Sequence, residues 1–367
     1  MEIISVGPIK PMRGGIAHSN EVMSKNLSKN NSLTNISFKR LYPKILYPGK
    51  FQATDGENTG ALDSINPLNW LSEKKKLQNV ETVIFQWWTT FLFPCYIFLS
   101  SGTKAKKIAL CQNVFPHSEG PLKLISNPIN RFFSKLFLSR MDRLVAMSNS
   151  DKKILQKIFP KKEIGIYFEP IYDLPELEKN KITRDQAKKE LNLKTNTILF
   201  FGFIREYKGL EYLLKALPEI LKKTDAELLI VGEFWESKSK YENIIKELKL
   251  SLKIRIIDGY VPDSEIGKYF MGADLLVLPY TSISESGVIR MAFNFNTPVL
   301  STDVGGNPDH IENNLNGFLV PPKNSGEIAK KAVEFFEKKL YRKFSEGMKK
   351  KRKELEWSPE KEKSLLG

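Results

Sequence analysis

The chain has 367 residues, a length that exceeds what one hydrophobic core usually supports, so two domains are expected. Its 41% hydrophobic content is that of an ordinary globular protein and argues against a disordered chain. The two cysteines, Cys95 and Cys111, stand in apolar surroundings and indicate reduced thiols of a cytosolic protein. With three histidines in the chain, a metal centre built from several histidines is not expected. The chain has no Asp-x-Asp pair, which argues against a diphosphate held through a metal ion.

Most of the net charge of +15 lies in the first half of the chain. Residues 1–172 hold 24 Lys and Arg against 12 Asp and Glu, a net charge of +12, and the remainder carries +3. This imbalance predicts an anionic partner for the first half: a membrane face, a lipid-diphosphate acceptor or a nucleic acid. Ordinary solubility of a lysine-rich protein is the alternative. The main basic clusters lie at 74–76, 104–107, 152–153 and 161–162.

Apolar runs and amphipathic stretches alternate along the chain, which predicts an α/β fold with parallel sheets. The expected strands are 3–7, 34–38, 82–87, 107–111 and 143–147 in the first half, and 197–201, 227–231, 254–258, 274–278 and 299–301 in the second. The polar stretch 48–70 predicts a long loop. The pattern breaks near 173–190, so the expected domains are residues 1–175 and 190–350, followed by a terminal segment, 351–367.

The apolar stretch 83–99 is about as long as the shortest membrane spans. Gln86 and Pro94 interrupt it, so we expect a strand, a turn and a helix that begins near Pro94. The N-terminus lacks the charged region that precedes the apolar core of a signal peptide. The sequence therefore predicts a cytoplasmic protein that is at most peripheral, on the inner face of the membrane.

The strand expected at 197–201 is followed by a loop with two glycines and two cations, Gly202 to Gly209, and by an amphipathic helix over 210–223. The first turn of such a helix offers unpaired N–H groups and a partial positive charge. Arg205 can hold phosphate oxygens through two hydrogen bonds, and Lys208 adds a point charge. We therefore expect a phosphate site on an exposed loop, with a plain turn and solvated cations as the alternative.

The strands expected at 274–278 and 299–301 end in loops rich in small residues. The first loop opens a helix at Ser286-Gly287-Val288, and the second ends in Gly305-Gly306. In doubly wound sheets, ligands bind at the carboxyl ends of neighbouring strands. This edge is therefore expected to carry the same ligand as the loop before residue 210.

In order along the chain, these segments resemble the retaining GT-B-fold nucleotide-sugar glycosyltransferases of the glycosyl transferase group 1 family. The matching stretches are G-x-x-R-x-x-K-G-L at 202–210, A-D-x-x-x-x-P-Y at 273–280, T-P-V…G-G at 297–306 and R-G-G-I at 13–16. The resemblance covers nearly the whole chain. It implies two Rossmann-like doubly wound parallel-sheet domains with an interdomain cleft, the first on the acceptor side, and a terminal helix within 351–367 that crosses back to the first domain.

The activity that the resemblance implies is transfer of a hexosyl unit from a UDP- or GDP-linked sugar to a glycan or lipid-linked acceptor, with retention of configuration. No metal and no further cofactor are expected. Such an enzyme acts in surface polysaccharide, lipopolysaccharide or glycolipid biosynthesis, and its basic first domain is expected to contact an anionic membrane. A nucleic acid is not expected, since RNA-reading signatures are missing. Two alternatives stay open: a nucleotide-sugar-binding homologue without catalysis, and a basic protein that binds membrane surfaces or nucleic acid.

The family motifs also imply roles for individual residues. Arg205 and Lys208 would stabilise the negative charge that builds on the leaving diphosphate. The implied donor-binding residues are Gly14, Gly15, Ile16, Gly202, Gly259, Tyr260, Val261, Glu285, Ser286, Gly287 and Val288. Candidates for contact with the donor sugar or the acceptor are Gln112, Asn113 and His117, whereas His18 and His310 are expected to be structural.

The sequence departs from the family pattern at two places. Met291 stands where the family has the glutamate that binds the ribose, and the position of the first family glutamate falls on Ile283, close to Glu285. Where many relatives have a histidine after the fourth strand, this chain has Gln112, which can form hydrogen bonds but cannot shuttle a proton. Ribose recognition in this chain therefore cannot use that carboxylate.

Overall fold

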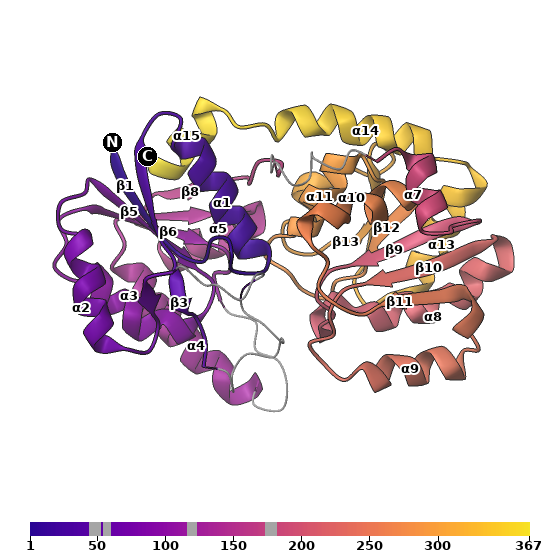
Figure 1. The fold of residues 1–367 in the computed structure, drawn as a ribbon, viewed down its shortest axis with the longest axis horizontal. Coiled ribbons are helices and arrows are strands. Elements are labelled where there is room, and N and C mark those ends of the chain that lie inside the picture. Colours follow the sequence, from indigo (N-terminus) through magenta and orange to yellow (C-terminus); the bar gives the residue numbers. More distant parts are fainter. Residues whose placement is uncertain (44–52, 54–59, 116–122, 173–181) are drawn as a thin grey trace. The chain divides into compact units, whose positions relative to one another are not determined.

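The computed structural model describes residues 1–43, 53, 60–115, 123–172 and 182–367, with the backbone alone for 123–127. Two compact units make up the described chain (Figure 1). Unit 1 consists of Met1–Pro170 and Trp357–Gly367, and unit 2 of Ile171–Glu356. The first unit thus ends at residue 170, where 175 was expected, and the chain returns to it at 357, where 351 was expected.

Unit 1 is built on a six-stranded parallel sheet with the strand order β2-β1-β5-β6-β7-β8. The strands are β1 (Glu2–Val6), β2 (Ser32–Ile36), β5 (Thr82–Trp87), β6 (Lys106–Cys111), β7 (Arg143–Ala146) and β8 (Ile164–Ile166). The helices are α1 (Gly15–Leu27), α2 (Pro67–Lys76), α3 (Phe93–Ser100), α4 (Lys123–Ser139), α5 (Asn149–Ile158) and α15 (Pro359–Leu366), with a short 3-10 turn, η2 (Thr90–Leu92). Every residue of β5 is buried, which explains why this strand is a continuous apolar run with Gln86 as its one strongly polar member.

Parts of unit 1 differ from the expectation. The predicted strand 34–38 is two strands, because β2 ends at Ile36 and β3 (Phe38–Arg40) pairs with β4 (Leu62–Asp63). The predicted loop 48–70 is wrong over its last residues, where β4 and the start of α2 lie. The Asn66 side chain caps α2 by accepting a hydrogen bond from the Leu68 amide at 3.1 Å, and Pro67 is the first helical residue. Residues 44–52 and 54–59 lie outside the described residues.

The apolar stretch 83–99 is a strand followed by a helix, as predicted. It consists of most of β5, the turn η2 and most of α3, with Pro94 in the first turn of the helix. Among the helices of the described residues, none has the length and apolar content needed to cross a bilayer.

Unit 2 has a second six-stranded parallel sheet with the order β11-β10-β9-β12-β13-β14. The strands are β9 (Asn196–Phe201), β10 (Ala226–Val231), β11 (Ile254–Ile257), β12 (Leu275–Leu278), β13 (Val299–Thr302) and β14 (Gly317–Val320). The helices are α7 (Arg184–Glu190), α8 (Leu210–Lys223), α9 (Lys238–Glu247), α10 (Asp263–Gly272), α11 (Gly287–Phe295), α12 (Asn307–His310), α13 (Ser325–Glu337) and α14 (Tyr341–Glu354), with 3-10 turns η3 (Glu206–Lys208) and η4 (Ser251–Lys253). The α/β class with two Rossmann-like parallel-sheet domains is therefore confirmed.

The strand order of unit 2 indicates which edge of its sheet is suited to hold a ligand. From β9 the chain builds outward through β10 to β11, then returns to β12 on the other side of β9 (Figure 1). The connection therefore reverses direction between β9 and β12, and in doubly wound sheets ligands bind at the carboxyl ends of the strands that flank such a reversal. The loops that follow β9 and β12 are those that the sequence singled out.

The last helix of the chain, α15, packs in unit 1 next to β8. The Ser364 carbonyl accepts a hydrogen bond from Arg143 Nη2 at 2.9 Å, and Ser364 Oγ accepts one from the Ile166 amide at 3.2 Å. The Leu365 side chain is fully buried in a core cluster with strand residues of the sheet. Helix α14, which precedes it in sequence, packs on α11 in unit 2.

We expect Leu365→Ala to lower the free energy of unfolding of unit 1 by about 2–4 kcal/mol, because a buried leucine is truncated and a cavity remains. Urea unfolding followed by tryptophan fluorescence suits this test, since Trp70, Trp87, Trp88 and Trp357 lie in unit 1 and Trp235 alone in unit 2. Leu68→Ala is the matched control, because Leu68 is 77% exposed. An equal loss in both variants would contradict the role assigned to α15.

Candidate functional site

The two loops at the carboxyl ends of β9 and β12 are joined to each other. The Thr281 amide donates a hydrogen bond to the Tyr207 carbonyl at 2.8 Å. Gly209 has a φ of +68°, and a Cβ atom placed there would lie 2.0 Å from the carbonyl oxygen of Pro279. Only glycine fits this close approach, so the glycine of the predicted motif is a steric requirement of the contact between the loops.

Lys208, at the end of the first loop, is buried rather than exposed as the sequence predicted. Its side chain lies under the ring of Tyr280, with Nζ 4.3 Å from the ring centroid, and donates a hydrogen bond to the Tyr280 hydroxyl at 2.9 Å. No carboxylate of the described residues forms an ion pair with this ammonium. Burial lowers the pKa of Lys208, and the nearby positive charge of Arg205 lowers it further. An anion bound here would offset both effects.

Arg205 is half-buried and lies against aromatic rings. Its guanidinium carbon is 5.4 Å from the ring centroid of Tyr207 and 5.5 Å from that of Trp235. Trp235 in turn stacks on Phe203 with ring centroids 4.3 Å apart. Cation–π contact of this kind holds a guanidinium in place without neutralising it, so Arg205 brings a second positive charge close to Lys208.

The first turn of α11 lies beside the same loop. A Cβ atom placed on Gly202 would lie 3.5 Å from Cγ2 of Val288, so the start of the helix contacts the end of β9. Its N-cap residue is Ser286, whose side chain makes no capping hydrogen bond to the helix. A Cβ atom on Gly287 would lie 2.6 Å from the Tyr172 hydroxyl, so a larger residue there would displace the Tyr172 side chain. Helix N-termini without a side-chain cap are favourable places for anions.

Three glycines mark the ends of adjacent strands along this edge. Gly202 follows β9, Gly232 follows β10, and Gly259 lies just after β11. Backbone hydrogen bonds connect them, from the Gly202 amide to the Val231 carbonyl at 2.9 Å and from the Gly259 amide to the Gly232 carbonyl at 3.3 Å. The predicted base-contacting residues Gly259, Tyr260 and Val261 are half-exposed here, two strand positions from the cationic loop. Gly232 was missed, although a glycine directly after a buried strand is the signal that could have identified it.

Glu285, one of the predicted donor-binding residues, belongs to a buried ion-pair cluster. Its side chain is buried, and Oε1 lies 3.2 Å from Arg290 Nη2 and 3.0 Å from His310 Nε2. Against the effect of burial, the contacts with His310 and Arg290 lower the pKa of the Glu285 carboxyl. These contacts connect the loop before α11 to α12. A donor-binding role for Glu285 stays a prediction.

His310 completes this buried cluster as a neutral ring. Burial and the charge of Arg290 lower the pKa of His310. Its Nδ1 lies 3.1 Å from Arg290 Nη1, and its Nε2 lies 3.0 Å from Glu285 Oε1 and 2.9 Å from Arg290 Nη2. The prediction that His310 is structural agrees with these contacts.

In unit 1, the predicted residues gather at the ends of β1 and β6. Gly14 precedes α1, which begins at Gly15, and a Cβ atom on Gly15 would meet nothing within 4 Å. Gln112 follows β6 and is buried, with Nε2 donating to Ser19 Oγ of α1 at 3.0 Å and to Gln86 Oε1 at 2.9 Å.

Asn113 is half-buried and donates a backbone hydrogen bond to the Trp87 carbonyl at 3.2 Å. His117 lies outside the described residues. The hydrogen bond from Gln112 to Ser19 thus connects the end of β6 to the first half of α1, where Ile16 also lies. The roles predicted for Gly14, Gly15, Ile16, Gln112 and Asn113 stay predictions.

Comparison with known proteins identifies the domain that carries the cationic loop. Residues 181–353 match the sequence profile of the glycosyl transferases group 1. This part of the chain belongs to that family. An uncharacterized glycosyltransferase of Methanocaldococcus jannaschii is 34% identical over 36% of the chain and 33% of its own length. The D-inositol 3-phosphate glycosyltransferase of Segniliparus rotundus is 30% identical over 39% of the chain and 34% of its own length.

Solved structures match the chain over nearly its whole length. Sucrose-phosphate synthase from Thermosynechococcus elongatus has a TM-score of 0.76 at 14% identity, over 100% of this chain and 97% of that one. Anabaena HepE in complex with UDP-glucose has a TM-score of 0.73 at 14% identity, over 96% and 95%. At such identities the likeness shows the fold alone. The first curated sequence relatives are matched over about a third to a half of their own length.

We expect the stability of unit 2 to fall as the pH drops below 6.5, the ordinary pKa of histidine. Because the pKa of His310 is lowered in the folded state, the unfolded chain binds the proton first, and the slope reaches up to about 1.4 kcal/mol per pH unit from this residue. Urea unfolding between pH 7.5 and 5.5 measures it. His310→Gln should be less stable at pH 7.5 but lack this slope, while His18→Asn in unit 1 should keep it. An unchanged slope in His310→Gln would refute the assignment.

Proposed function

We propose that this protein is a glycosyltransferase that moves a hexosyl unit from a nucleotide diphosphate sugar to an acceptor hydroxyl. The observation that carries the proposal is the Lys208 ammonium, which is buried without a carboxylate partner among the described residues, beside Arg205 and the uncapped start of α11. The membership of residues 181–353 in the group 1 family supports this function over other uses of an anion site.

In the proposed reaction, the bond between the sugar and the diphosphate breaks, and negative charge builds on the leaving phosphate. Three groups of unit 2 stabilise this charge. Arg205 binds phosphate oxygens through its planar guanidinium, Lys208 contributes a desolvated ammonium oriented by the Tyr280 hydroxyl, and the first N–H groups of α11 add their dipole. These charges are held in place before the reaction by backbone contacts between the loops, so little reorganisation is needed when charge develops.

Several finer features are part of the proposal. The donor is a UDP- or GDP-linked sugar, which the UDP-glucose complex of the similar fold of HepE supports. The transfer retains configuration and needs no metal, and the acceptor is a glycan or a lipid-linked saccharide of surface polysaccharide or glycolipid biosynthesis. We place the protein in the cytoplasm, with contact to the inner face of an anionic membrane.

A second candidate function is binding of nucleotide sugars without turnover. Met291, where the family has the ribose-binding glutamate, is 4% exposed in α11 and offers no hydrogen-bond partner to a ribose hydroxyl. In the second candidate the same loops hold the diphosphate, but no transfer follows. Measurements of binding and of turnover on the same protein separate the two functions.

We expect Arg205→Ala and Lys208→Met each to reduce donor turnover about 100-fold or more, since each removes a charge from the site of developing negative charge. Methionine keeps the volume of the buried Lys208 side chain, so the loop retains its packing. Transfer to saccharide acceptors and slow donor hydrolysis are measured with UDP-, GDP- and ADP-sugars. Lys223→Met, on the exposed end of α8, is the matched control and should keep full activity. Full activity in both site variants would disprove the charge-stabilising role.

We expect the preferred nucleotide sugar to raise the melting temperature of unit 2. Binding to the folded state alone stabilises it by about 2.7 kcal/mol at a ligand concentration 100 times the dissociation constant. A thermal-shift panel of UDP-, GDP- and ADP-sugars identifies the base. Lys208→Met should lose the shift, while Lys223→Met should keep it. A shift without turnover on any acceptor favours the second candidate, and no shift with any nucleotide sugar contradicts both.

A further inference from the structure

Exposed large apolar side chains are concentrated in unit 1. In the described chain, apart from Met1, seven such side chains are exposed, and Leu252 alone belongs to unit 2. Three lie at the start of α2: Ile65, Leu68 and Leu71. The other three lie on α4 and α5, where Ile129 is 50%, Phe132 61% and Ile154 41% exposed. Exposed apolar side chains of unit 1 therefore gather at two places, and those on α4 and α5 lie beside a groove.

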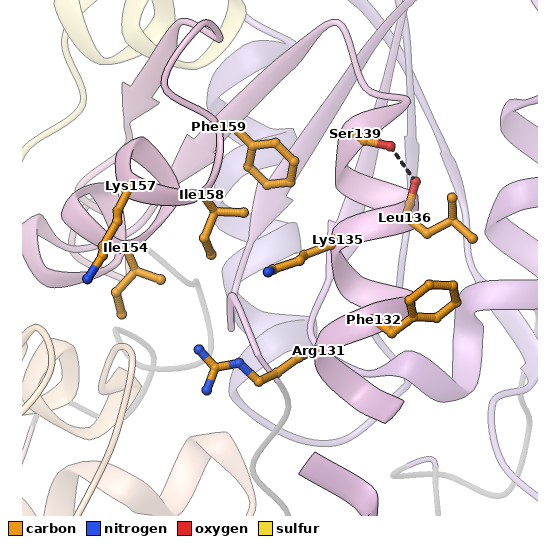
Figure 2. A pocket seen from close by; sticks show the side chains of 9 residues that line it. All are labelled: Arg131, Phe132, Lys135, Leu136, Ser139, Ile154, Lys157, Ile158 and Phe159. Carbon is orange, nitrogen blue, oxygen red and sulfur yellow. Dashed lines mark hydrogen bonds between the residues drawn. The ribbon is translucent and has the colours of Figure 1, made fainter. Parts of the chain in front are cut away.

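The groove runs between α4 and α5 and has a volume of about 830 Å³. Apolar side chains and cations line it together: Leu136, Ile158 and Phe159 with Arg131, Lys135 and Lys157. Figure 2 shows the side chains of Arg131 and Lys135 extending from α4 towards α5. At one end, Lys162 Nζ donates a hydrogen bond to the Ser139 carbonyl at 2.8 Å, which ties the end of α4 to the segment after α5. We call these two helices and the groove between them the α4–α5 face.

The cations of the α4–α5 face are not neutralised by the carboxylates that the structure describes. Helix α4 contains no Asp or Glu from Lys123 to Ser139, and the single acidic residue of α5, Asp151, is buried in its first turn. Arg131 lies 4.7 Å from the ring centroid of Phe115, a contact that leaves its charge in place. Unpaired cations beside exposed apolar side chains therefore characterise this face.

Lysines on the helices of unit 2 behave differently. Many of them pair with a glutamate three or four residues away on the same helix. Examples are Lys222 with Glu219 at 2.5 Å, Lys330 with Glu327 at 3.2 Å and Lys338 with Glu334 at 2.8 Å. A high lysine content alone would leave both units with similar surfaces. The lack of a described carboxylate partner therefore distinguishes the cations of the α4–α5 face from these lysines.

We propose that the α4–α5 face docks on the surface of an anionic phospholipid bilayer. Phe132, Ile129 and Ile154 would enter the boundary between headgroups and acyl chains, while Arg131, Lys135 and Lys157 meet the lipid phosphates. A nucleic acid would use the cations but would gain nothing from exposed isoleucines beside them. An acidic lipid surface matches both the charge and the apolar side chains of the face.

This inference names the surface for the membrane contact that belongs to the proposed function, and it does not depend on glycosyl transfer. The experiments distinguish a failure of the membrane-docking proposal from a failure of the proposed glycosyltransferase function. Variants of the α4–α5 face should keep the thermal shift caused by nucleotide sugars, because the cationic loop lies in unit 2. Variants of Lys208 should keep vesicle binding. Both readouts are therefore measured on each variant.

The test is co-sedimentation of the full chain with vesicles of phosphatidylcholine, with and without phosphatidylglycerol, at low and high salt. The protein should bind the anionic vesicles and release them as salt increases. Exchange of Arg131, Lys135 and Lys157 for glutamine should weaken binding by about fivefold for each cation, or roughly 100-fold together. Phe132→Ser should weaken binding to the anionic vesicles at low salt without any change in charge.

Two controls match these variants. Exchange of Lys222, Lys330 and Lys338 for glutamine removes the same charge from unit 2, and Leu68→Ser removes an exposed apolar side chain from α2. Both should leave binding unchanged. The proposal is overturned if the wild-type protein does not bind anionic vesicles. It is also overturned if the control variants lose vesicle binding as strongly as the groove variants, or if the groove variants keep full vesicle binding.

Two further outcomes would assign the face to another occupant and so overturn the proposal. In the first, the glutamine variants lose salt-dependent binding to a single-stranded oligonucleotide while vesicle binding is unchanged. In the second, Phe132→Ser abolishes a dimer in sedimentation velocity experiments while vesicle binding is unchanged.

Discussion

The site in unit 2 depends on one close backbone contact, the approach of Gly209 to the Pro279 carbonyl. The two residues follow the adjacent strands β9 and β12 and are 70 positions apart in the sequence. This contact brings Lys208 under the ring of Tyr280 and away from solvent. Without it, Lys208 would be an ordinary surface lysine at the start of an amphipathic helix. The chemistry proposed for the loop is therefore a property of the two loops together.

Local sequence signals predicted most elements of the fold. The helix over 210–223 and the strand at 82–87 were predicted to the residue, because a strong amphipathic period and a continuous apolar run leave few alternatives. Strands β8 and β14 were missed, since three or four residues that include a glycine carry almost no periodic signal. The start of α2 was missed because its capping residues stand in a polar stretch that was interpreted as a loop.

The sequence predicted those parts of the candidate site that short, continuous segments of the chain form by themselves. The sequence located the cationic loop, which directly follows the apolar strand β9, and the start of α11, which comes after the loop that follows β12. It could not show that Lys208 is buried, because its partner Tyr280 follows another strand. Nor could it show that Glu285 contacts Arg290 and His310, which lie on helices α11 and α12. In unit 1 the same limit applies to Gln112, whose amide belongs to a buried network with Gln86 and Ser19.

The environment of Lys208 also bears on product release after the proposed transfer. An ammonium that burial deprives of water, and that no described carboxylate neutralises, is stabilised by an anion at every stage of the cycle. The spent nucleotide carries more negative charge on its terminal phosphate than the intact donor does. In the proposed reaction the spent nucleotide would therefore compete with the donor for the same two cations, and inhibition by this product is expected.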